Sequence, residues 1–168
     1  QEIEILIYCG VYRTGYVLEP AYATLLAGDL DLNSTPGGLS KGQTFAFDIF
    51  NGSVGFLNAC HVAQQLLAAG KCKTIMVVTA ETENNREDFP DELLGIRETA
   101  SAIILHADPD STKGFSRFLF QSHIKSSEAY ITYCDTSTVQ PRLQITRDDD
   151  LERQYLKYIC KDVQELLT

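Results

Sequence analysis

Short apolar runs rich in β-branched residues alternate along this chain with stretches of helical periodicity. The first three runs cover residues 2–9, 44–50 and 73–79, and helices are expected between them at 20–30 and 54–69. This order of apolar strands and helices is typical of a parallel sheet that helices cover on both faces. We therefore predict an α/β fold built on a mostly parallel sheet.

The rest of the chain continues this pattern with shorter or more polar elements. Residues 81–94 are acidic and irregular and are expected to form a loop. Further strands are predicted at 100–106, 114–124 and 130–134. Residues 148–167 have the periodicity of an amphipathic helix, whose expected apolar side consists of Leu151, Tyr155, Ile159 and Val163.

The composition is that of a globular chain, with 44% hydrophobic and 22% charged residues among 168. The apolar runs are much shorter than the ~20 residues that span a bilayer, so no membrane span is expected. A net charge of −9 disfavours nucleic acid as a general partner, because phosphates carry the same sign. The five cysteines are scattered and odd in number, which favours a reducing cytoplasm over a disulfide framework or metal site.

Residues 47–56 place a hydroxyl between a buried strand and a buried helix. At such a turn Ser53 would project from the carboxyl edge of the sheet, where helix amides stabilise developing negative charge. Asn51 and Gly52 precede it and are the expected substrate-binding residues, since glycine permits close approach of the backbone. A plain helix cap is the alternative interpretation, because serine is a preferred capping residue.

Other known motifs and a catalytic partner are not evident around Ser53. The turn departs from G-x-S-x-G at Asn51, no GK[ST] follows as in a P-loop, and the G-x-G-x-x-G fingerprint does not fit. A serine nucleophile needs a base. His61 lies eight residues further along the expected helix, roughly 12 Å away, and His106 and His123 fall in predicted strands.

Several segments resemble the β-ketoacyl-ACP synthase III family of the thiolase superfamily. The segment FDIFNGSVGFLNACHVAQQLLAAGKCKTIMVVTAE is similar to that family's strand, nucleophile turn, buried helix and next strand. EILIYCG and EPAYATLLAGDL resemble the preceding strand and helix, RETASAIILHAD a later strand, and DDDLERQYLKYICKDVQELL the first helix of the second half. The resemblance implies a thiolase-like fold, with residues 1–135 in the first half and 136–168 beginning the second.

The resemblance implies catalytic roles and also reveals two departures. Ser53 occupies the position of the nucleophilic cysteine, and Arg97-Glu98-Thr99 replaces a Gly-Asp-Gly turn. Amides near Val54 and Gly55 would stabilise the oxyanion. The family's catalytic His and Asn lie in a second half that this chain does not include, so this segment alone is expected to be inactive.

Acyl carrier protein or acyl-coenzyme A is the implied partner, and a homo- or heterodimer is expected. Lys157 matches a family position for carrier docking, and Arg153, Lys157 and Lys161 form a basic stripe at i, i+4 and i+8. An ordinary solvated helix face is the alternative interpretation. Leu18 matches a region that closes the acyl pocket at the dimer interface, and Arg86 lies where the family lines the coenzyme A entrance.

The expected function is acyl transfer or decarboxylative condensation from an acyl-CoA or acyl-ACP thioester, with Ser53 at the nucleophile position. The coenzyme A or phosphopantetheine thioester would be the substrate, and no separate cofactor is expected. The alternative is a non-catalytic ketosynthase-like partner subunit that shapes a heterodimer, which the serine and the altered turn at 97–99 motivate. A nucleotide-binding Rossmann domain fits the layers but lacks the fingerprint.

Overall fold

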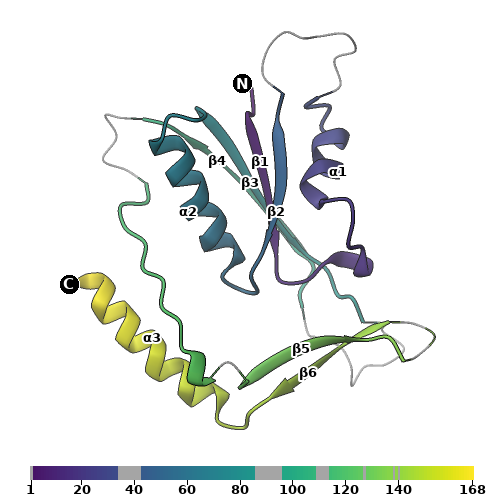
Figure 1. Ribbon diagram of the computed structural model, residues 1–168, viewed down its shortest axis with the longest axis vertical. Coiled ribbons are helices and arrows are strands. Elements are labelled where there is room, and N and C mark those ends of the chain that lie inside the picture. The colour runs from purple at the N-terminus through teal and green to yellow at the C-terminus, as the bar shows by residue number, and fades with distance from the viewer. Residues whose placement is uncertain are drawn as a thin grey trace. The chain divides into compact units, whose positions relative to one another are not determined.

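The chain forms two compact units (Figure 1). A computed structural model describes residues 2–33, 43–85, 96–108, 114–126, 128–137, 139 and 141–168. The first unit consists of Gln1–Glu83 with Ile96–Thr112, and the second of Asn84–Gly95 with Lys113–Thr168. The division into family halves at residue 135 stays a prediction.

The first unit is built on a four-stranded sheet with the order β2-β1-β3-β4. Its strands are β1 (Ile5–Gly10), β2 (Phe45–Phe50), β3 (Thr74–Glu81) and β4 (Thr99–His106). β1 pairs in parallel with both β2 and β3, which confirms the mostly parallel sheet. β4 runs antiparallel to β3, so the sheet is mixed at this edge.

Two helices, α1 (Tyr22–Asp29) and α2 (Gly55–Ala68), cover opposite faces of this sheet, as Figure 1 shows. The alternation of β1 explains the two cores, because successive side chains of a strand point to opposite faces. Ile5, Ile7 and Cys9 pack in the cluster that includes α2, whereas Leu6 and Tyr8 pack in the cluster that includes α1. The predicted coverage of both faces is therefore confirmed.

The helix ends agree with the sequence at one position and differ at another. Gly70 follows α2 with φ +64°, and its N–H donates to the Leu67 carbonyl at 3.0 Å, as expected for a C-terminal glycine. The helix expected at 20–30 begins two residues later, at Tyr22, with Ala21 as its N-cap. Ala21 has no capping side chain, so the first amides of α1 need another acceptor.

The second unit contains the antiparallel pair β5 (Tyr130–Asp135) and β6 (Arg142–Arg147) and the helix α3 (Leu151–Leu167). β5 and α3 were predicted, whereas β6 was missed because its alternation is weak and polar. The predicted strand at 114–124 is wrong. Residues 115–123 have neither helix nor strand structure and lead into the 3₁₀ turn η3 (Ile124–Ser126), because alternating apolar residues cannot distinguish a paired strand from an unpaired segment.

The segment that leads into η3 makes polar contacts with α3. Arg117 donates to the Leu166 carbonyl at 3.2 Å, and His123 lies 3.1 Å from a carboxylate oxygen of Asp162. On the apolar side of α3, Leu151 is buried but Tyr155, Ile159 and Val163 are 48–55% exposed. Within the residues that the structure describes, no helix is both long and apolar enough to cross a membrane.

Candidate active site

A tight turn joins the end of β2 to the start of α2. Gly52 has φ +52°, a left-handed conformation that costs other residues about 1 kcal/mol. The N–H of Gly55 donates to the Gly52 carbonyl at 3.0 Å and closes the turn. The amide of Asn51 donates to Oδ1 of Asn58 at 2.6 Å, which ties the turn to the second turn of α2. Ser53 lies within this braced turn, and its side chain is exposed.

The Ser53 hydroxyl takes no part in holding the turn together. The N-cap of α2 is Val54, with no side-chain capping bond, so the capping interpretation of Ser53 does not describe this structure. Among the described residues, none forms a hydrogen bond with the Ser53 side chain. The expected oxyanion role of the Gly55 amide needs a correction, because that N–H is already engaged with Gly52.

The turn lies at the carboxyl edge of the parallel strands, packed closely against their backbone. A Cβ on Gly55 would lie 3.5 Å from the carbonyl oxygens of Gly10 and Ile49, at the ends of β1 and β2. A Cβ on Gly10 would lie 3.3 Å from the Ala80 carbonyl oxygen, near the end of β3. Ligands of open α/β sheets bind at this edge, so Ser53 occupies a suitable place for chemistry.

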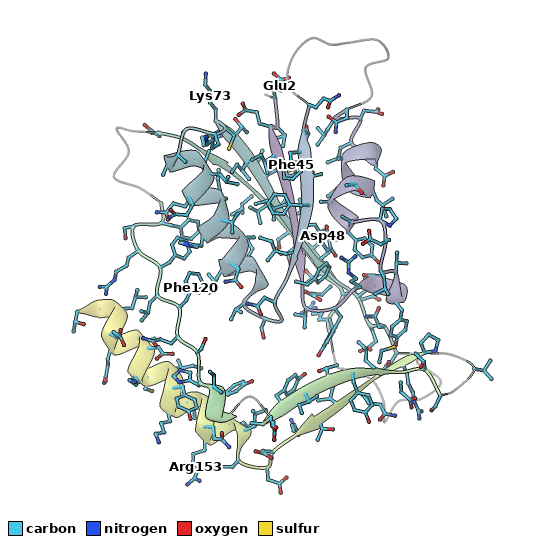
Figure 2. All side chains as sticks on the ribbon, in the orientation of Figure 1. Glu2, Phe45, Asp48, Lys73, Phe120 and Arg153 are labelled. Carbon is cyan, nitrogen blue, oxygen red and sulfur yellow. The ribbon has the colours of Figure 1, made fainter. Side chains whose placement is uncertain are left out.

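A buried carboxylate that the sequence analysis missed lies in β2, two residues before the end of the strand. The Asp48 side chain, 4% exposed, accepts the N–H of Tyr22 at 2.9 Å and of Ala23 at 2.8 Å (Figure 2). It thus caps α1 from a different element. Arg13 pairs with Asp48 at 3.3 Å, and its guanidinium lies 4.7 Å from the Phe50 ring centroid. The available signal was a lone charge within an apolar strand.

A second carboxylate, Glu81 at the end of β3, binds the backbone that follows β1. It accepts the N–H of Val11 at 2.6 Å and also bonds the backbone of Tyr12. Burial raises the pKa of Glu81, and these two hydrogen bonds oppose the rise. The neighbouring Tyr8 hydroxyl donates to the Ala80 carbonyl at 3.0 Å, and burial, reinforced by the Glu81 charge, raises its pKa to about 12. Both groups are structural ties around the carboxyl edge.

The two histidines of the first unit, His61 and His106, are not brought to Ser53. His106 ends β4 opposite Thr74, at the amino end of β3, so it lies at the other edge of the sheet. Its Nδ1 is 3.3 Å from the Thr74 hydroxyl. His61 lies in α2, two helical turns beyond Ser53, and His123 belongs to the second unit, where Asp162 binds it. Neither histidine of the first unit is therefore placed to act as the base for Ser53.

The buried cysteines are poor replacements for a nucleophilic thiol. Cys9, Cys60 and Cys72 are buried, while Cys134 and Cys160 are exposed. Burial raises the pKa of Cys9 to about 11 and also raises the pKa of Cys60 and Cys72. Since the thiolate is the reactive form, none of the three is activated.

Alkylation with iodoacetamide is expected to separate the cysteines. A short pulse at pH 8 should modify Cys134 and Cys160 in the folded protein, and leave Cys9 unmodified because only about a thousandth of that thiol is ionised. Peptide mass spectrometry measures the modification, and the same pulse in denaturant, which should label all five, is the control. Fast modification of Cys9 in the folded state would contradict the burial that the structure shows.

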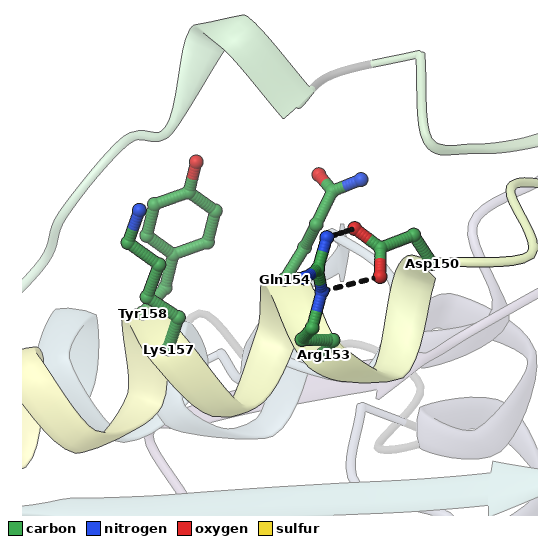
Figure 3. Close-up of a pocket in the computed structure, with 5 residues that line it drawn as sticks. All are labelled: Asp150, Arg153, Gln154, Lys157 and Tyr158. Atoms are coloured by element: carbon green, nitrogen blue, oxygen red, sulfur yellow. Dashed lines mark hydrogen bonds and ion pairs between the residues drawn. The ribbon is translucent and has the colours of Figure 1, made fainter.

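The predicted basic stripe lies along exposed α3, but its members differ. Arg153 forms a double hydrogen bond with Asp150, at 2.6 and 2.8 Å, which raises the pKa of the arginine and lowers that of the carboxyl. Lys157 and Lys161 are exposed and form no ion pair with any residue that the structure describes. A pocket of about 320 Å³ is lined by Asp150, Arg153, Gln154, Lys157 and Tyr158. Figure 3 draws these five side chains on and next to α3.

The two remaining predicted site residues have different outcomes. Leu18 lies between η1 (Thr14–Tyr16) and α1, and its side chain is 74% exposed. An exposed leucine in this loop is consistent with a contact to an acyl chain or a partner, and its role stays a prediction. Arg86 lies outside the described residues.

Comparisons with known proteins connect this geometry to a family. Residues 47–124 match the family model described as 3-Oxoacyl-[acyl-carrier-protein (ACP)] synthase III. A β-ketoacyl-[acyl-carrier-protein] synthase III of Rhodospirillum rubrum is 36% identical over 81 residues, which are 47% of this chain and 25% of the relative. Over this region the chain is similar to the synthase III family. The matched region contains the end of β2, the Ser53 turn, α2, β3 and β4.

Solved structures show the same fold over nearly the whole chain. A 3-oxoacyl-(acyl-carrier-protein) synthase III matches with a TM-score of 0.71 at 16% identity, covering 99% of this chain and 52% of that one. A Cys-to-Ser variant of Xanthomonas campestris OleA, with bound lauric acid and lauroyl-CoA, matches with a TM-score of 0.66 at 22% identity. This match covers 98% of the chain and 50% of the OleA chain. The chain thus spans about half the length of these structures.

Proposed function

We propose that the synthase III-like chain contributes the nucleophile of a thiolase-type acyl-thioester condensation or acyl transfer. The observation that carries this proposal is the position of Ser53 on the turn at the carboxyl edge of the sheet. Its side chain is exposed, and its hydroxyl does not cap α2. The similarity to synthase III over residues 47–124 supports the choice of thioesters as substrates.

In the first step, Ser53 Oγ attacks the thioester carbonyl carbon and gives its proton to a base. The tetrahedral intermediate collapses with cleavage of the carbon–sulfur bond, and the released thiolate of coenzyme A or phosphopantetheine takes up a proton. The backbone amide of Val54 is the proposed oxyanion donor from this chain, since Gly55 donates within the turn. We propose that the base comes from outside the described residues.

In the second step, an acceptor nucleophile attacks the acyl-serine ester and regenerates the hydroxyl. In the condensation, the acceptor is the carbanion released when a carboxylated thioester loses carbon dioxide. In the transfer reactions, the acceptor is an oxygen or nitrogen nucleophile. The thioester itself is the only cofactor-like group in this proposal, and the proposed location is the cytoplasm.

Intact-mass spectrometry of the protein as its gene encodes it tests the first step. Incubation with an acyl-CoA should add the mass of one acyl group to the wild type and none to Ser53→Ala. An unmodified wild type, or an adduct that persists in Ser53→Ala, would show that Ser53 is not the nucleophile.

A non-catalytic partner subunit is the second candidate function. Serine in place of the family's cysteine favours it, and so does β2, an edge strand whose outer side pairs with no strand of the described residues and whose Phe45 is 64% exposed. Such an edge favours pairing with another chain. Co-purification with a second ketosynthase-like chain and no acylation of Ser53 would support this candidate over the enzyme.

Carrier docking on α3 predicts a specific effect of charge. Changing Lys157 and Lys161 together to Glu should lower kcat/KM for an acyl carrier protein roughly 5–20-fold and leave that for acyl-CoA unchanged, because carriers are acidic. Steady-state kinetics with both donors measures this, and the carrier effect should shrink at high salt. Lys71→Glu, at an exposed site of the first unit, is the matched control. An equal loss with both donors would contradict the docking role.

A further inference from the structure

Two carboxylates, the buried Asp48 and the half-buried Glu81, lie on the strands on either side of β1 and hold the segment that leaves β1. From β2, Asp48 pairs with Arg13 and accepts the first amides of α1. From β3, Glu81 accepts the amides of Val11 and Tyr12. A further hydroxyl–hydroxyl bond, 2.9 Å between Thr82 and Thr14, adds to the same attachment. The segment from residue 11 to the start of α1 is therefore fixed at both ends by carboxylates.

This held segment starts beside the Ser53 turn. In the parallel register, Gly10 at the end of β1 pairs with Phe50 at the end of β2, directly before the turn. The close approach of Gly55 to the Gly10 carbonyl places the start of α2 against the same point. Residues 11–21, which include Leu18, thus continue from the strand that adjoins the nucleophile turn.

Both oxygens of Asp48 are engaged in these contacts, which argues against a role of Asp48 in proton transfer. Oδ1 of Asp48 accepts from Ala23, and Oδ2 accepts from Tyr22 and pairs with Arg13. The Asp48 side chain is 4% exposed and therefore not accessible to a substrate. Glu81 lies on β3, at the other side of β1 from Asp48, and accepts from the backbone of Val11 and Tyr12.

We propose that Asp48 and Glu81 are positioning residues that hold residues 11–21 in place beside the Ser53 turn. The expected effect on acylation rests on the proposed function, but the attachment of residues 11–21 does not. Loss of either carboxylate should release this segment while the sheet remains folded. A misplacement of about 1 Å at a reacting centre can cost on the order of 100-fold in rate.

The test compares Asp48→Asn and Glu81→Gln with the matched control Glu4→Gln. Glu4 also accepts backbone amides, those of Lys73 and Thr74, but at the amino end of β3, away from the turn. Hydrogen exchange in the complete protein should become at least about tenfold faster across residues 11–23 in the two test variants only. Acylation of Ser53 by acyl-CoA should slow about 10–100-fold in the same two variants.

If Asp48→Asn fails to fold, Arg13→Gln takes its place in the test, because it removes the ion pair with Asp48 and keeps the cap of α1. It should accelerate exchange around residue 13 and slow acylation to a smaller extent. Unchanged exchange across residues 11–23 would overturn the proposal, and so would equal slowing of acylation in Glu4→Gln. If the wild type is not acylated at all, the proposed function fails, and the exchange result alone supports or overturns the attachment.

Discussion

Replacing Ser53 with alanine is expected to lower acyl transfer by about 10⁴-fold or more, because the bond-forming oxygen is lost. The substitution should hardly alter folding, since the side chain is exposed and has no hydrogen-bond partner among the described residues. Its free energy of unfolding should stay within about 0.5 kcal/mol of the wild type. Turnover of an acyl thioester, measured beside chemical denaturation, separates these effects.

Ser53→Cys is the matched gain-of-function variant. A thiol is more acidic than a hydroxyl and depends less on a positioned base, so the acyl-enzyme should form faster than in the wild type. The thiol at residue 53 would also react with iodoacetamide, unlike buried Cys9 and Cys60. Full turnover in Ser53→Ala, or no acylation in either the wild type or Ser53→Cys, would contradict the proposed role of this turn.

Ile7→Ala is expected to lower the free energy of unfolding of the first unit by about 2–5 kcal/mol. Ile7 is fully buried at the centre of β1, in the cluster with Ala59 and Ala63 of α2. Truncation removes apolar burial and leaves a cavity under the helix that begins at the Ser53 turn. Chemical denaturation followed by circular dichroism measures the loss.

Ile104→Ala in β4 is the control, with the same side chain removed from a strand of the same sheet. Ile104 is 48% exposed, so this change should cost about 1 kcal/mol or less. Equal losses in the two variants would contradict the packing of α2 on β1, because they would place both isoleucines in similar surroundings.

The sequence was sufficient for those elements whose pattern is governed by burial. The apolar runs of β1 and β3 were recognised, since their residues follow from being buried. In the second unit the sequence was sufficient for β5 and α3 but not for the rest. β6 has the polar sequence RLQITR, and the aromatic segment before η3 alternates like a strand but lacks a strand partner.

The candidate site was recognised in part for the same reason. The turn around Ser53 follows from local pattern, because strand, glycine and helix succeed one another. The functions of Asp48 and Glu81 depend on contacts with residues 25 to 70 positions away, which no local pattern contains. A lone charge inside an apolar strand was the available signal for Asp48, and only the fold shows that its partners are Arg13 and α1.

The position of the acyl group on the wild-type protein tests the proposed function most directly. After incubation of the complete protein with an acyl-CoA, proteolysis and tandem mass spectrometry identify the modified residue. The proposal predicts a single acyl ester on Ser53, removed when an acceptor thioester is added. An acyl group on one of the five cysteines, or none on Ser53 after prolonged incubation, would contradict it.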